Sequence, residues 1–393
     1  MYLGGYGVKF FHLSDLHIGR QLNGYSLKES QERAFSQIAA YVEAERPDAV
    51  LICGDIYDKM VPAAEAYPMF EAFLRMLTEG EAAPAVLVIS GNHDSPERLS
   101  YAASFLERHN IHIAAGRPSP EGLKKVTLSD AYGPVCFYLF PFIRPGHVRD
   151  QFGEGAVTDY ESAFRMVLER ETPDPAARNV ILAHQFFTAA GARPGTCDSE
   201  TAVLMAGGLD NIDVSALGAF DYAALGHLHG AQRVGEERFR YCGTAYPYSV
   251  SEEFHKKSVT VVTLAEKGAP AAIRTLPLVS EPGVRRVRGT LSWVLEAAQE
   301  NGDDYVSITL TDELEPSRFR EQLEERYARI LDIRFDNSRT KRRLTEEMEH
   351  IEEQSPLEAF CQFYETMRAC PMTGRQRDIM QKVIEEAMEG GTA

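Results

Sequence analysis

This 393-residue sequence lacks several features that would place it in a specialised class of protein. No run reaches the roughly 18 apolar residues that a membrane span requires, and the N-terminal stretch holds no apolar segment behind a basic start. No G-x-x-x-x-G-K-[ST] phosphate loop is present, so this chain is not expected to bind ATP. We therefore expect a soluble, cytoplasmic protein that makes no contact with a membrane.

Paired cysteines are absent and positive charge is in deficit. The six cysteines show no C-x-x-C spacing, and Cys53 and Cys136 lie in apolar runs that are typical of buried, reduced thiols. Lysine and arginine number 41 against 58 acidic residues, which gives a formal net charge of −17. This balance excludes a generally basic surface for nucleic acid, because phosphate neutralisation needs clustered lysine and arginine. A polyanionic substrate would have to be attracted by bound cations or by local basic patches.

Apolar, β-branched runs alternate with helix-like stretches in the first two thirds of the chain. Strands are expected at 8–13, 49–53, 85–90, 135–140, 180–183 and 222–225, and helices at 29–45 and 65–77. This βαβ spacing predicts a layered α/β domain over residues 1–277, with its site at the carboxyl ends of the strands. The chain is long enough for more than one such core.

A second pattern follows residue 281. Alternating strands and helices predict a small α/β accessory domain over residues 282–337, and residues 338–393 read as a linker with helices at 356–368 and 374–388. Apolar side chains recur on these two helices at three- and four-residue steps: Leu357, Phe360, Tyr364, Met367, Ile379 and Val383. The helices either pack on their own domain or form a docking platform for another chain, and their spacing leaves both alternatives open.

Short polar blocks follow the expected strands. The blocks are Asp15-Leu16-His17, Gly54-Asp55, Gly91-Asn92-His93-Asp94 and Gly226-His227-Leu228-His229, and His184 ends a further strand. Taken singly, each has an ordinary explanation as a salt bridge, a cap, a turn or a satisfied core histidine. In an extended chain, side chains two apart share a face, so the Asp15 carboxylate would converge with the His17 ring, and the His227 ring with that of His229.

The joint pattern favours a metal centre over these separate explanations. Four histidines, two aspartates and one asparagine all stand at predicted strand ends, where neighbouring strands of a sheet would bring them together. Imidazole combined with carboxylate suits manganese, iron or zinc better than calcium.

Six segments also carry a resemblance to a known family: HLSDLHIG, LICGDIYD, ISGNHD, ILAHQ, ALGHLHGAQ and YCGTAYPYS. They resemble the calcineurin-like metallophosphoesterase superfamily and, within it, the SbcD-type nuclease subunits of bacterial SbcCD complexes. The resemblance implies a layered metallophosphoesterase β-sandwich flanked by helices, with a small α/β capping domain and a C-terminal helical tail.

The resemblance also implies a site. One metal ion would be bound by Asp15, His17, Asp55 and His229, and the other by Asp55, Asn92, His184 and His227, so that Asp55 bridges two divalent ions, with Mn²⁺ favoured. His93 follows a ligand without being one, and we expect it to stabilise the transition state or protonate the leaving oxygen. Asp58 is expected to orient His93, as a similarly placed carboxylate does in related phosphatases. Asp94 is left without a role.

The implied activity is cleavage of DNA phosphodiesters, as a 3′-to-5′ exonuclease on duplex ends and as an endonuclease on hairpins or single strands, in repair, replication and recombination. The implied assembly is a homodimer within a heterotetramer, with an SbcC-type ATPase bound through the C-terminal helices. Candidate DNA contacts are Arg285, Arg286, Arg288, Arg339, Lys341, Arg342 and Arg343. Each basic cluster is also explained by an ordinary solvated face.

Other functions could use the same metals. A protein phosphatase usually has Arg-Gly after its second block, whereas Lys59-Met60 follows Asp58 here. A small-molecule phosphodiesterase would have little use for the accessory domain and the helical tail. A non-catalytic scaffold for DNA ends would not need the complete set of ligand types and His93.

Overall fold

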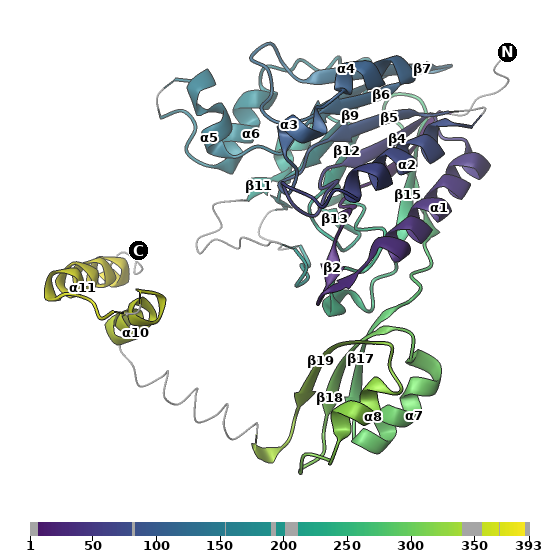
Figure 1. Cartoon of the computed structure of the whole chain (residues 1–393). Coiled ribbons are helices and arrows are strands. Elements are labelled where there is room, and N and C mark those ends of the chain that lie inside the picture. The colour runs from purple at the N-terminus through teal and green to yellow at the C-terminus, as the bar shows by residue number, and fades with distance from the viewer. Residues whose placement is uncertain are drawn as a thin grey trace. The chain divides into compact units, whose positions relative to one another are not determined.

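The computed structural model describes residues 7–80, 83–153, 155–189, 194–200, 211–339, 356–368 and 370–389. The chain divides into two compact units, Met1–Arg286 with Asp303–Val306, and Val287–Gly302 with Ser307–Ala393 (Figure 1). Among the described residues, no helix has both the length and the apolar character needed to cross a bilayer.

The first unit contains a six-stranded sheet of order β16-β15-β1-β4-β5-β6. Its parallel part runs through β1 (Val8–Leu13), β4 (Ala49–Cys53), β5 (Ala85–Ile89) and β6 (Ile111–Ala114). Antiparallel strands β15 (Ser258–Leu264) and β16 (Ala272–Pro277) complete the sheet on the other side of β1. β1, β4 and β5 run in the same direction, so the segments that follow them emerge at one edge.

A second six-stranded sheet has the order β13-β14-β12-β9-β8-β7. Its central strands β8 (Gly133–Phe140), β9 (Arg178–His184), β12 (Tyr222–Gly226) and β14 (Glu236–Tyr241) are parallel. The edge strands β7 (Lys124–Asp130) and β13 (Gln232–Val234) are antiparallel to their neighbours.

The two sheets pack face to face with helices outside them. Alternate residues of each strand point to opposite faces, and Phe10 of β1 joins a core shared with Phe137 of β8 and Tyr222 of β12. The next residue, Phe11, packs instead with α1 (Lys28–Glu45) and α2 (Ala66–Thr78), which cover the outer face of the first sheet (Figure 1). Helix α6 (Tyr160–Leu168) contributes to the core on the outer face of the second sheet. The expected α/β class, a layered sandwich flanked by helices, is confirmed.

Shorter elements connect these layers. They are β2 (Gln21–Leu22), β3 (Tyr25–Ser26), α3 (Pro96–Leu99), α4 (Ala103–Leu106), α5 (Pro145–Val148), β10 (Phe187–Thr188) and β11 (Ile212–Asp213).

The C-terminal part of the chain contains a three-stranded sheet of order β17-β18-β19. Its strands are β17 (Val284–Gly289), β18 (Tyr305–Leu310) and β19 (Arg329–Phe335), with α7 (Leu291–Asn301) and α8 (Phe319–Glu324) in the connections. Helices α10 (Pro356–Arg368) and α11 (Gly374–Glu389) follow in the second unit.

Candidate metal centre

The polar blocks follow the central strands of both sheets of the first unit. Asp15 and His17 lie beyond β1, Asp55 beyond β4 and Asn92 beyond β5, whereas His184 ends β9 and the fourth block lies at the end of β12. The main-chain NH of Asp15 donates to the carbonyl of Gly54 (2.9 Å), and that of His17 to the carbonyl of Asp55 (3.0 Å). These bonds hold the first two blocks side by side beyond their paired strands.

The backbone of these blocks differs from the extended chain that the sequence suggested. Asp15, His17, Asp55 and His227 have φ values of 52°, 43°, 50° and 104°, in the left-handed region that side chains other than glycine seldom adopt. Such conformations cluster where function requires a particular side-chain direction. The two histidines of the fourth block therefore do not point to one place.

One cluster gathers Asp15, His17 and His229, whose potential ligand atoms lie within 4.8 Å of one another. The Nε2 atoms of His17 and His229 are 3.2 Å apart, and His17 Nε2 is 3.7 Å from Asp55 Oδ2. Burial lowers the pKa of His17 well below its usual value, so its ring is neutral and offers a lone pair. His17 Nδ1 is buried and has no hydrogen-bond partner among the described residues.

A second cluster gathers Asp15, Asp55 and His184, also within 4.8 Å. His184 Nε2 lies 3.4 Å from Asp55 Oδ2 and 3.0 Å from Asn92 Oδ1, and His227 Nδ1 is 3.0 Å from the same Asn92 oxygen. The other ring nitrogen of His184 contacts the carbonyl of Cys53 at 2.7 Å, which fixes the orientation of the ring. The Asp55 carboxylate therefore lies beside members of both clusters.

The electrostatics of the two clusters favour bound cations. Burial opposes protonation of His184, but the Asp55 carboxylate outweighs burial and raises the pKa of His184 to about 9. Burial and the neighbouring His184 lower the pKa of His227 to about 3. Positive charge is thus stabilised beside Asp55, while neutral imidazoles and an amide oxygen surround it. This donor set fits divalent ions of the manganese, iron or zinc type.

His93 is held differently from the expectation. Its Nδ1 contacts the main-chain carbonyl oxygen of Asp58 at 2.8 Å, and its main-chain NH donates to Asp55 Oδ1 at 2.8 Å. The Asp58 carboxylate instead accepts a bond from Arg20 (2.9 Å) and lies 3.7 Å from His17 Nδ1. Asp58 therefore orients His93 through its backbone, because the carboxylate is directed toward Arg20.

Asp94, which the sequence left without a role, ties two loops together. Its buried carboxylate accepts main-chain bonds from Ile56 (3.1 Å), Tyr57 (3.0 Å) and Gly91 (2.8 Å). The loop that carries Asp55 is thereby joined to the loop that carries Asn92.

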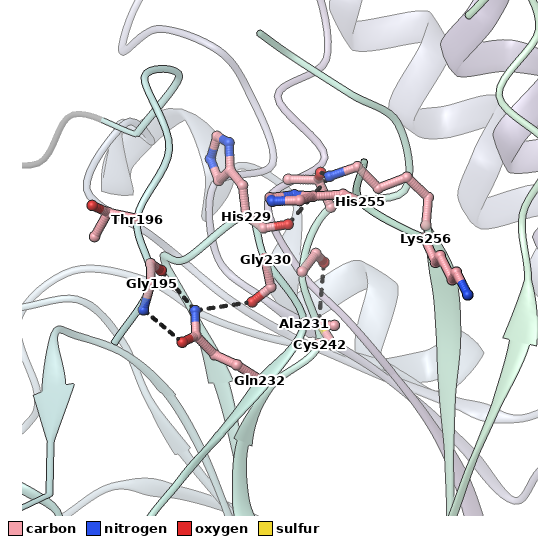
Figure 2. A pocket seen from close by; sticks show the side chains of 12 residues that line it. Gly195, Thr196, His229, Gly230, Ala231, Gln232, Cys242, His255 and Lys256 are labelled. Carbon is pink, nitrogen blue, oxygen red and sulfur yellow. Dashed lines mark hydrogen bonds between the residues drawn. The ribbon is translucent and has the colours of Figure 1, made fainter. Parts of the chain in front are cut away.

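Sequence reasoning missed the residues that surround His229. The Ser199 hydroxyl lies 2.7 Å from His229 Nδ1, and the buried side chains of Glu252 and Lys257 pack behind it. No spacing signal links these positions, which come from three separate segments. Beside them lies a pocket of about 350 Å³ lined by His229, Gly230, Gln232, His255 and Lys256, among others (Figure 2).

The expected DNA contacts on β17 are paired with acidic side chains. Arg285 bonds to Asp304 and Arg288 to Asp336, and Arg286 lies 3.2 Å from Glu253. Arg339 is exposed. The remaining basic candidates, Lys341, Arg342 and Arg343, lie outside the described residues.

The expected partner-binding side chains lie on α10 and α11. Leu357, Phe360 and Tyr364 are partly buried, whereas Met367, Ile379 and Val383 are 67%, 55% and 48% exposed. The apolar faces of both helices thus remain partly open to solvent.

Comparison with known proteins adds two family matches. Residues 8–230 match the family described as calcineurin-like phosphoesterase, and residues 283–368 match the one described as type 5 capsule protein repressor C-terminal domain.

Individual relatives are more distant. The chain is 30% identical over 259 residues to the SbcD-type subunit of nuclease SbcCD from Staphylococcus epidermidis, a match that covers 65% of this chain and 66% of that protein's length. Among solved structures, it resembles GAP50, the anchor in the inner membrane complex of Plasmodium, at 13% identity and a TM-score of 0.43 over 71% of this chain and 86% of that one. It also resembles TT1561 of Thermus thermophilus, at 14% identity and a TM-score of 0.40 over 68% and 99% of the two chains.

Proposed function

Because this chain belongs to the calcineurin-like phosphoesterase family, we propose that it is a metal-dependent DNA nuclease subunit that hydrolyses phosphodiester bonds. The observation that carries the proposal is the position of Asp55. One carboxylate oxygen lies 3.7 Å from His17 Nε2 in the first cluster and 3.4 Å from His184 Nε2 in the second. This is the arrangement that a carboxylate shared by two cations requires.

Seven side chains would hold the two ions, with Mn²⁺ favoured: Asp15, His17, Asp55 and His229 for one, and Asp55, Asn92, His184 and His227 for the other. When bound, the ions supply Lewis-acid chemistry for hydrolysis at phosphorus. The protein's own contribution is to fix the donors on strand ends, where the buried sheets leave them little freedom.

His93 is placed to act on the substrate. Its Nδ1 donates to the Asp58 carbonyl, which cannot itself donate, so the ring is locked with Nε2 4.0 Å from Asp55 Oδ2. The side chain is 20% exposed, whereas that of Asp55 is 3% exposed. In its protonated form, His93 can give its Nε2–H to a phosphoryl or leaving oxygen.

The choice of DNA as substrate rests on the remainder of the chain. The relative in Staphylococcus epidermidis is a subunit of a nuclease, and the family match over 283–368 extends beyond the phosphoesterase region. We propose a nuclease domain over 1–277, a capping domain over 282–337, and residues 338–393 as the segment that binds an SbcC-type ATPase. We further propose 3′-to-5′ exonuclease and hairpin endonuclease action by a cytoplasmic heterotetramer that contains two copies of this chain.

A direct test compares two substrates. The purified chain is incubated with end-labelled hairpin DNA and, separately, with a nitrophenyl phosphate monoester, each with Mn²⁺ or with a chelator, and with or without the partner ATPase. We expect Mn²⁺-dependent cutting of the DNA and little turnover of the monoester. Turnover of the monoester alone would instead establish a phosphatase and refute the nuclease proposal.

A further inference from the structure

His229 is held from behind by a chain of hydrogen bonds that the ligand pattern does not include. Its Nε2 faces His17, and its Nδ1 lies 2.7 Å from the Ser199 hydroxyl oxygen. Since that hydroxyl donates its own proton to Glu252 Oε1, it must accept from His229, and Nδ1 therefore carries the ring proton. The Nε2 lone pair is left directed into the metal centre.

The acceptor at the end of this chain is itself fixed. Glu252 is fully buried and its second carboxylate oxygen accepts from the Lys257 ammonium, which also donates to Thr244 Oγ1 (2.6 Å) and to the His229 carbonyl oxygen (3.2 Å). Glu252 Oε1 also accepts from the main-chain NH of Tyr248 at 3.1 Å. Both the ring and the backbone of His229 are thus connected to one buried ion pair.

Ser199 reaches this position because its loop is fastened to the segments around it. Gln232 exchanges two bonds with Gly195, both of 2.8 Å (Figure 2), and the main-chain NH of Asp198 donates to Ser251 Oγ (2.9 Å). The Glu200 carboxylate accepts from the main-chain NH of His229 at 2.7 Å. His17, by contrast, receives no such support, because no described residue forms a hydrogen bond with its Nδ1.

We propose that Ser199 and Glu252 are positioning residues for His229, which set its tautomer and ring orientation and thereby determine the affinity of one of the two metal sites. The general reason is that a ligating histidine is oriented by the acceptor on its other ring nitrogen, and loss of that acceptor typically costs 10- to 100-fold in metal affinity. The inference rests on the metal-dependent function proposed above. It assigns to the 194–200 loop a specific task in that function, which is to supply the acceptor for His229.

The test measures Mn²⁺ binding rather than activity. Free Mn²⁺ is followed by electron paramagnetic resonance during titration of the full chain, with Ser199→Ala, Ser199→Thr and Glu252→Gln compared with the unaltered protein. We expect Ser199→Ala and Glu252→Gln to weaken one of two binding steps by about 10- to 100-fold and to leave the other unchanged. Ser199→Thr, which keeps the hydroxyl, should restore binding to within about threefold of the starting value.

Glu171→Gln is the matched control, because Glu171 is also a buried carboxylate paired with a lysine, Lys125, at 2.6 Å. It should leave both steps unchanged. If Ser199→Ala binds Mn²⁺ as tightly as the unaltered chain at both steps, the positioning role is refuted while the metal-dependent function stands. If the unaltered chain itself binds no Mn²⁺, the proposed function fails. Should Glu252→Gln not fold, the two Ser199 variants decide the question.

Discussion

At the scale of single residues, the centre combines predictable chemistry with unpredictable backbone. The residue types at the strand ends indicated the seven ligands, and the structure brings all seven into two adjoining clusters. Their directions were not predictable, because Asp15, His17, Asp55 and His227 have positive φ values that no residue pattern encodes. His227 and His229 consequently separate, the first toward Asn92 and the second toward His17.

Removal of the His93 ring should separate binding from turnover. His93→Ala leaves all seven candidate ligands in place, so we expect Mn²⁺ binding to persist while hairpin cleavage falls by about 10²-fold or more, the usual contribution of a proton donor. The measurement pairs an Mn²⁺ titration with initial cleavage rates. His109→Ala, an exposed histidine outside the site, serves as the control. Unchanged cleavage by His93→Ala would rule out its proposed role.

The Asp58 carboxylate should matter much less than its position suggests. Since His93 contacts the main-chain oxygen of Asp58 and the carboxylate is bonded to Arg20, Asp58→Asn keeps the contact that orients His93. We expect cleavage within about fivefold of the unaltered protein, because a partly exposed ion pair contributes little. A loss as large as that of His93→Ala would show that the carboxylate itself acts on the ring.

At the scale of elements, long strands and helices were predictable and short ones were not. The expected strands at 8–13 and 49–53 coincide with β1 and β4, because a continuous apolar run is a strong signal for a buried strand. The two-residue strands β2, β3, β10 and β11 are too short to show any periodicity. A helix expected at 316–326 begins only at Phe319, since Arg318 is in the left-handed region with φ 54°.

Close approach of the two sheets at the site explains a requirement for glycine at the end of β12. A Cβ on Gly226 would lie 1.9 Å from the carbonyl oxygen of Cys53, on β4 of the other sheet, and 2.7 Å from His184 Nδ1. Gly226→Ala must therefore push the sheets apart or displace His184. We expect a loss of about 3 kcal/mol or more in the free energy of unfolding and weaker Mn²⁺ binding.

Denaturant unfolding and an Mn²⁺ titration measure both effects. Gly146→Ala is the control, because a Cβ there meets no atom within 4 Å. Equal stability of the Gly226 and Gly146 variants would mean that the two sheets have more freedom to separate than the structure indicates.

At the scale of the whole molecule, the charge balance and the proposed substrate are reconciled by the metal centre. The net charge of −17 repels a polyanion over most of the surface. Two divalent cations beside the carboxylates of Asp15 and Asp55 would leave a local charge of about +2, which is the field that a phosphodiester meets at short range. The three arginines on β17 add little, since each faces an acidic side chain.

The last two helices allow partner binding to be tested without disturbing the nuclease. Met367 on α10 and Ile379 on α11 are 67% and 55% exposed, so acidic residues at both positions should not unfold the chain. An apolar interface would exclude such charges, and truncation of a side chain at its centre typically costs more than about 1 kcal/mol of binding. We therefore expect Met367→Glu with Ile379→Glu to abolish co-purification with an SbcC-type ATPase.

Mn²⁺-dependent hairpin cleavage by the altered chain alone should stay within about twofold, because both substitutions lie outside the phosphoesterase region. The control, Gln362→Glu with Gln381→Glu, adds the same charge to α10 and α11 at positions that point away from Met367 and Ile379. It should keep both association and cleavage. Continued association of the first variant would mean that these apolar faces are not the docking platform, and loss of association by both variants would point to charge alone. Only loss confined to the apolar positions, with cleavage retained, supports a chain whose chemistry lies in the strand ends and whose assembly depends on its last two helices.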